Sequence, residues 1–125
     1  MKLLSLLKSA AFIIISLNTN AIENEVFYSK QFCDNLLGQT EYLLKDLSRV
    51  DCLTDTHAFE VDWADGSKVY EAIGQSLYYS SETGRLPGIL LLIRKENSEK
   101  SIRKVRRVID TFELPIKLIL LDVRI

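Results

Sequence analysis

Three acidic side chains in the middle of the chain could bind a divalent metal ion. Asp51 and Glu60 flank a turn at Thr54–Thr56 at similar distances, so an antiparallel hairpin would place them nearly opposite each other. Asp62 shares a strand face with Glu60, because side chains alternate with a period of two. Carboxylates this close repel one another unless a cation lies between them. Hard oxygen ligands in this number suit Mg²⁺ or Mn²⁺, and we expect no organic cofactor.

A predicted helix that follows these acids carries a polar stripe. At about 100° per residue, four side chains fall within an arc of about 80°. They are Lys68, Glu71, Gln75 and Tyr79. The neighbouring side would pack on the sheet and consists of Val69, Ala72, Ile73 and Leu77. The helix dipole does not favour a cation at a helix start, so the position of Lys68 indicates another role, toward the acids.

The elements that must position these side chains follow the order α-β-β-β-α-β-α-β. They are a helix at 23–37, strands at 40–44, 49–53 and 57–63, a helix at 68–83, a strand at 88–93, a helix at 98–111 and a strand at 116–123. The run at 88–93 is continuously apolar, which is typical of a central strand covered on both faces. Three successive strands followed by β-α-β crossovers predict an α/β fold with a mixed central sheet flanked by helices.

The acids and the helix stripe together resemble a known nuclease pattern. Asp51, then Glu60-x-Asp62, then Gln75-x-x-x-Tyr79 is similar to the RecB-type (QxxxY) branch of the PD-(D/E)XK nuclease superfamily. Residues 51–58 and 71–75 also resemble small uncharacterised bacterial members of that branch. The motifs cover about residues 41–93. Elsewhere only the element order agrees, and it is similar to the restriction-endonuclease-like core, αβββαβ with a further helix and strand.

The resemblance implies a metal-dependent phosphodiesterase site. Asp51 and Glu60 would hold the metal, together with the backbone carbonyl of Val61. Gln75 and Tyr79 would orient the lysine, the water or the phosphate. A metal held there would activate a water and stabilise the charge that builds on a scissile phosphate.

The sequence departs from the branch pattern at one position. The motif has a lysine where this chain has Asp62. The expected substitute is Lys68, whose long side chain could reach the same place from the facing helix. Glu71 would add a metal ligand or pair with Lys68. If Lys68 does not reach, the site would bind metal without cleaving the substrate.

Composition places a single domain behind a targeting segment. The chain has 125 residues and a net charge of −1, from 16 basic and 17 acidic side chains. Residues 1–21 resemble a secretory signal, with Lys2 and Lys8 before an apolar run at 10–17 that is too short to span a bilayer. Cleavage after Ala21 would leave a domain at 22–125 with 14 basic and 17 acidic residues, a net charge of −3. That domain would be periplasmic or secreted; an uncleaved anchor and an ordinary N-terminal helix are the alternatives, and a chain without a signal would be cytoplasmic.

The two cysteines, Cys33 and Cys52, both follow the predicted signal. In an oxidising compartment they are a candidate disulfide, and two buried free thiols are the alternative. Two cysteines and one histidine offer too few soft ligands for a zinc site.

A basic run follows the predicted fourth strand. Seven positive charges lie between Arg94 and Arg107. The expected nucleic-acid contacts among them are Lys100, Arg103, Lys104 and Arg107, which could track a phosphate backbone. The alternative is a solvated helix face, interrupted by Glu96 and Glu99.

These patterns favour an exported, metal-dependent phosphodiesterase that hydrolyses nucleic acid, with DNA as the expected substrate. The alternative is a degenerate nuclease-fold domain that binds nucleic acid or a protein partner in the cell envelope without turnover. A disulfide-tied structural domain is a third hypothesis. A domain this small would need a partner copy to surround a duplex, so we also expect a homodimer.

Overall fold

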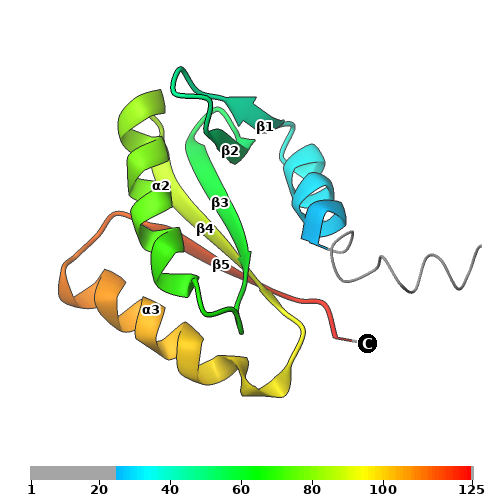
Figure 1. The fold of residues 1–125 in the computed structure, drawn as a ribbon, viewed down its shortest axis with the longest axis vertical. Coiled ribbons are helices and arrows are strands. Elements are labelled where there is room, and N and C mark those ends of the chain that lie inside the picture. Colours follow the sequence, from blue (N-terminus) through cyan, green and yellow to red (C-terminus); the bar gives the residue numbers. More distant parts are fainter. Residues whose placement is uncertain (1–24, 125) are drawn as a thin grey trace, which may run out of the picture.

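The protein forms three layers, with helices on both faces of a mixed five-stranded sheet. The computed structural model describes residues 25–124, so the predicted signal at 1–21 lies outside the described residues. The strands stand in the order β1-β2-β3-β4-β5, so sheet neighbours are also successive strands in the chain. Figure 1 shows α2 and α3 on one side of the sheet and the first helix on the other.

The sheet combines an antiparallel meander with two parallel crossovers. Its strands are β1 (Gln39–Leu43), β2 (Arg49–Leu53), β3 (His57–Trp63), β4 (Leu86–Ile93) and β5 (Lys117–Asp122). The pairs β1–β2 and β2–β3 are antiparallel, and the pairs β3–β4 and β4–β5 are parallel. A parallel pair needs a crossover, and the two helices α2 (Val69–Thr83) and α3 (Glu99–Thr111) supply them.

The fourth strand contributes to the hydrophobic clusters on both faces of the sheet. Ile89 and Leu91 face α2 and α3, where they pack with Ala72, Ile102 and Val105. The alternate residues Leu90 and Leu92 face the first helix, residues 25–35, and pack with Val61, Trp63, Tyr28 and Phe32. Burial on both faces explains why the sequence of β4 is apolar without alternation.

The predicted order of elements and the mixed sheet are confirmed. Each strand begins and ends within about two residues of its expected limits, which is the usual uncertainty of element ends. The short helix η1 (Glu96–Ser98), which leads into α3, was not predicted. No helix within residues 25–124 is long and apolar enough to cross a membrane.

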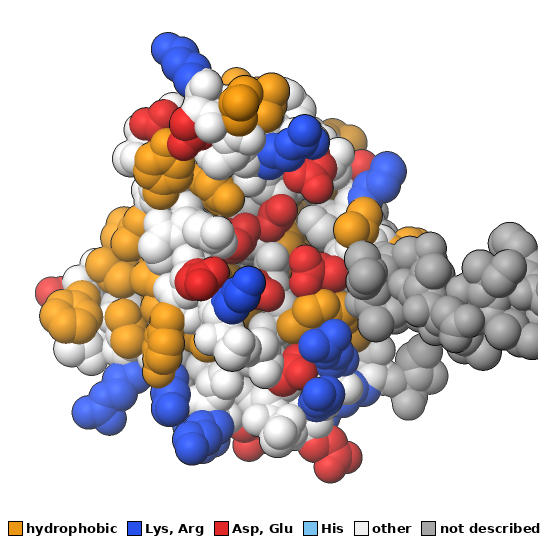
Figure 2. Space-filling model, in the orientation of Figure 1, with side chains coloured by type: hydrophobic (Ala, Val, Ile, Leu, Met, Phe, Trp, Pro, Cys, Tyr) orange, Lys and Arg blue, Asp and Glu red, His pale blue; other side chains and the backbone are white. Residues whose placement is uncertain are grey.

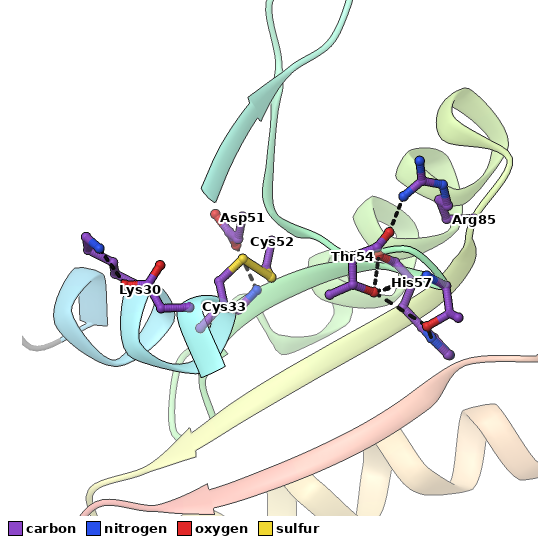
Figure 3. Close-up of a disulfide and its surroundings, with 10 residues drawn as sticks. Lys30, Cys33, Asp51, Cys52, Thr54, His57 and Arg85 are labelled. Carbon is purple, nitrogen blue, oxygen red and sulfur yellow. Dashed lines mark hydrogen bonds and ion pairs between the residues drawn. A yellow bond between two sulfur atoms is a disulfide. The ribbon is translucent and has the colours of Figure 1, made fainter. Parts of the chain in front are cut away.

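A disulfide fastens the first helix to the sheet. Cys33, in the first helix, is bonded to Cys52 in β2, with their Cα atoms 5.5 Å apart (Figure 3). Both residues are fully buried. Gly38 lies against both sulfur atoms, and a Cβ there would stand 2.8 Å and 2.9 Å from them. The bond thus fixes the chain immediately beside Asp51.

Candidate active site

Asp51 lies where β2 separates from β3. The two strands are paired at Cys52–Phe59 and Leu53–Ala58, and one more step of this register places Asp51 opposite Glu60. At that step the Asp51 side chain accepts a hydrogen bond from the Val61 backbone N–H, at 2.7 Å (Figure 3). A carboxylate therefore takes the place of a strand carbonyl. The separation of the strands opens the edge of β3 beside an acidic side chain.

The neighbouring strand β1 is irregular at the same level. Its pairing with β2 includes Thr40–Cys52 and Tyr42–Val50 but omits Glu41, which would stand opposite Asp51. Glu41 has a φ of 53°, in the left-handed region that non-glycine residues seldom adopt. Both flanks of Asp51 thus depart from a regular ladder.

Glu60 is a buried carboxyl group beside Asp51. It is 7% exposed. The pKa of Glu60 is raised to about 10, mainly by burial. A hydrogen bond with Asp51 raises it further, and so do the negative charges of Asp51, Asp62 and Glu25. Without a cation, Glu60 therefore holds its proton at neutral pH.

Asp62 and Glu25 complete an acidic group, which we define as Asp51, Glu60, Asp62 and Glu25. Burial raises the pKa of Asp62, against a 2.8 Å hydrogen bond from the Trp63 N–H, and the charges of Asp51 and Glu71 raise it further. Burial also raises the pKa of Glu25, aided by the charges of Asp62 and Asp51. Figure 2 shows acidic side chains gathered in the middle of one face of the molecule.

Sequence reasoning missed Glu25. It lies in the first helix, far from Asp51 along the chain, and with Asp51 it lines a cavity of 210 Å³ that also includes Val61. The Cys33–Cys52 pair was the available signal, because that bond requires the first helix to lie over the strand that carries Asp51.

The positive charges near the acidic group are few. Lys68 precedes α2 and is exposed, and its charge lowers the pKa of Asp62. The Arg94 side chain is engaged elsewhere: its Nε lies 3.1 Å from Asp65, and its guanidinium lies 4.2 Å from the centre of the Trp63 ring. Within residues 25–124, Lys68 makes no salt bridge, so its ammonium is free to approach a substrate or the acids.

Tyr79, the last member of the predicted polar stripe, is buried in the core. It is 6% exposed and packs with Leu44, Val50 and Ala58. Burial raises the pKa of Tyr79 to about 12, and the charges of Glu60 and Asp51 add to the effect. The reason is helical periodicity, since position 79 lies three and seven residues after the buried Ser76 and Ala72. Tyr79 therefore approaches the acids from the core.

The other side chains of the predicted stripe, Lys68, Glu71 and Gln75, are exposed. Gln75 makes no side-chain hydrogen bond among the described residues. The structure thus brings Asp51, Glu60, Asp62 and Tyr79 together and places Lys68 and Glu71 within electrostatic reach of Asp62. Gln75 lies on the outer surface of the same helix.

The donor set fits a hard divalent cation by its chemistry. Asp51, Glu60 and Asp62 offer carboxylate oxygens, and their mutual repulsion is the kind that Mg²⁺ or Mn²⁺ relieves. In the part of the chain that the structure describes, no three His, Cys, Asp or Glu side chains are already gathered around one metal position. The Val61 N–H bonds one oxygen of the Asp51 carboxylate, so a metal would share this carboxylate with the Val61 N–H.

The predicted nucleic-acid contacts lie on the outer face of α3. Lys100, Arg103, Lys104 and Arg107 are all exposed. The opposite face of α3, formed by Ile102, Val105 and Ile109, is buried against the sheet and α2.

Comparison with known proteins gives no relative: no protein-family model, curated protein or solved structure matches the chain. The fold class that the structure itself establishes is a three-layer α/β domain. Kinship with the PD-(D/E)XK nucleases stays a prediction, and it depends on the residues and geometry described above.

Proposed function

We propose that the protein is a metal-dependent phosphodiesterase that hydrolyses nucleic acid, with DNA as the expected substrate. The observation that carries the proposal is the position of Asp51, at the point where β2 leaves β3 and directly beside the buried Glu60. Burying the Glu60 carboxyl group beside the half-buried Asp51 costs free energy that a purely structural role does not explain. The order αβββαβ and the mixed sheet support the finer proposal of a restriction-endonuclease-like core.

Asp51, Glu60 and the Val61 carbonyl would hold Mg²⁺ or Mn²⁺, with Asp62 beside them. The bound ion would supply a water of lowered pKa and would neutralise charge on the phosphate. The protein's own part is to keep these oxygens close together and partly shielded from solvent. Glu25, across the cavity, adds negative charge that strengthens the attraction for a cation.

Lys68, which directly precedes α2, and Tyr79, within α2, would assist the reaction. Lys68 is an exposed cation whose charge lowers the pKa of Asp62, and it would contact the phosphate from the side open to solvent. Tyr79 is held in its neutral form, because burial and the nearby carboxylates raise its pKa to about 12. Its position against the sheet would hold Glu60 in place. Gln75, on the outer surface, would reach only a bound substrate.

Cleavage assays test the proposal directly. Labelled single- and double-stranded DNA would be incubated with the purified chain in Mn²⁺, in Mg²⁺ or in EDTA. We expect cutting only with metal, and loss of cutting in Asp51→Asn. The exposed Glu82 has no side-chain hydrogen bond or salt bridge within the described residues, so Glu82→Gln is the matched control. Cutting in EDTA, or normal cutting by Asp51→Asn, would refute the proposal.

A second function is favoured by one feature. Asp62 stands where the nuclease pattern has its lysine, and its carboxylate is bound to the Trp63 N–H. A degenerate domain that binds nucleic acid or an envelope protein would show a metal-dependent rise in melting temperature without turnover. The same assays, run beside thermal melts with and without Mn²⁺, separate the two, because they report metal binding and cleavage independently.

Export and a homodimer belong to the same proposal. Residues 1–21 have the pattern of a secretory signal, so a periplasmic or secreted nuclease would act on foreign or extracellular nucleic acid. Two copies would surround a nucleic-acid substrate more fully than one domain. Cell fractionation and light scattering check these two points, and a cytoplasmic monomer would contradict both.

A further inference from the structure

The exposed side of α3 carries five basic side chains against two acidic ones, Glu99 and Asp110. Five basic side chains are exposed there: Lys100, Arg103, Lys104, Arg106 and Arg107. Within residues 25–124, the only salt bridge that any of them makes joins Arg103 to Glu99, at 3.8 Å. The whole chain has a net charge of −1, so this concentration reflects segregation of charge and not a basic composition. A surface of this kind attracts polyanions.

The arrangement of these charges is regular and fixed. Lys100, Arg103, Lys104 and Arg107 follow the spacing of one helix face and span about 10 Å along the axis. The helix cannot rotate them away, since Ile102 and its neighbours are packed into the core on the other side. These side chains border a shallow, open groove of 620 Å³ along the helix, whose lining also includes the acidic Asp110. Successive phosphates of a nucleic-acid strand could follow that groove.

An exposed aromatic residue follows the last turn of this helix in the chain. Phe112 directly follows α3 and is 70% exposed, so its burial contributes little to the core. Proteins that bind single strands combine exposed aromatic rings, on which bases stack, with cations that pair with the phosphates. Bases inside a duplex are already stacked on each other and offer no free face to Phe112.

We infer that α3 and Phe112 form a binding surface for single-stranded nucleic acid. The inference rests on the proposed function and narrows it, because it names the form of the substrate. In Figure 2, basic side chains lie along the lower part of the face whose middle carries acidic side chains. One strand could therefore contact α3 while another part of it approaches the acidic group.

A membrane surface is the competing polyanion. A helix that lies on a bilayer needs an apolar side to insert, and the apolar side of α3 is buried in the core. Phe112 alone offers little area for insertion. Charge complementarity together with the single ring therefore favours a nucleic-acid strand.

Binding measured in EDTA tests the inference without cleavage. Fluorescence anisotropy would follow a labelled single strand of about 15 nucleotides, and the corresponding duplex, at several salt concentrations. We expect tighter binding of the single strand. The triple variant Arg103→Gln, Lys104→Gln, Arg107→Gln should make the negative slope of log K against log salt shallower by about 2. Each phosphate that a cation neutralises contributes about −0.7 to that slope.

A matched variant removes the same charge elsewhere. Lys45, Arg49 and Lys117 are exposed and lie outside α3. Changing all three to glutamine should leave the slope of log K against log salt equal to the wild-type slope within experimental error. Phe112→Ala should weaken single-strand binding about fivefold or more and leave duplex binding unchanged. Phe27→Ala removes another exposed ring, 57% exposed in the first helix, and should have no effect.

Several results would overturn the inference. They are equal losses of affinity in the two triple variants, tighter binding of the duplex, or binding to vesicles of anionic lipid but not to DNA. Failure of the proposed function looks different, because the single strand would then bind normally in EDTA and would not be cut after Mn²⁺ is added. If the α3 triple variant still cuts and keeps its substrate affinity, the proposed binding surface is contradicted, while the proposed nuclease function stands.

Discussion

Glu60→Gln should stabilise the metal-free protein at neutral pH. In the folded chain, burial and the adjoining Asp51 raise the pKa of Glu60 to about 10, from an ordinary value of 4.5. The unfolded chain releases this proton near pH 4.5, while the folded chain keeps it. The free energy of unfolding therefore falls as the pH rises above about 4.5. Glutamine keeps the shape and can donate an N–H to Asp51, and it carries no such dependence.

The gain in stability follows from the unfolded-state pKa of 4.5, because the folded chain keeps this proton at pH 7. Each pH unit between 4.5 and 7 changes the free energy of unfolding by about 1.4 kcal/mol, which gives about 3 kcal/mol at pH 7. For a domain of this size, about 3 kcal/mol corresponds to a rise in melting temperature of roughly 12 °C or more. Below pH 4.5 the variant and the wild type should be equally stable.

Urea denaturation in EDTA measures this difference. The free energy of unfolding would be determined near pH 4.5 and near pH 7 for the wild type, for Glu60→Gln and for the exposed control Glu82→Gln. We expect the advantage of Glu60→Gln to grow with pH and the control to follow the wild type. Parallel pH profiles for all three proteins would show that Glu60 is not held as a buried protonated acid, and the reasoning would be refuted.

Three further perturbations probe the disulfide, the sheet and the site. The double change Cys33→Ala, Cys52→Ala should lower the free energy of unfolding by about 3 kcal/mol, because the bond closes a loop between residues 19 positions apart; an unchanged urea midpoint would contradict this. Gly88→Ala would put a Cβ 2.4 Å from the Phe59 ring and should lower the free energy of unfolding by about 1–3 kcal/mol. At Gly74 nothing lies within 4 Å of an added Cβ, so Gly74→Ala should not destabilise the protein. Thermal melts compare the two variants. Lys68→Gln should slow cleavage at least about tenfold, because it removes a cation placed to contact the phosphate. The Mn²⁺ affinity, measured by calorimetry, should stay within a few-fold of the wild-type value. Normal turnover would exclude Lys68 from the reaction.

The fold could be predicted because most of its elements have local sequence patterns. The strand β4 is apolar without alternation since both of its faces are buried, and β3 alternates Phe59, Val61 and Trp63 with Glu60 and Asp62. The facing of Asp51 and Glu60 also followed from the sequence, because a short turn between antiparallel strands fixes their register.

The rest of the site depends on contacts that no local pattern encodes. Glu25 comes close to Asp51 only because the first helix crosses the sheet, and Tyr79 is buried because α2 packs closely beside the hairpin. The hydrogen bond from the Val61 N–H to Asp51 requires the strands to separate at that residue. Spacing along the chain predicts neither the separation of the strands nor the burial of Glu60.

The most direct test is the rate at which a labelled single strand of DNA is cut in saturating Mn²⁺ by the wild type, Glu60→Gln and Glu82→Gln side by side. We expect cutting by the wild type and by Glu82→Gln, and a loss of at least about a hundredfold in Glu60→Gln, since the variant lacks a carboxylate that would hold the metal. Equal rates in all three proteins, or no cutting by any of them, would contradict the proposed function.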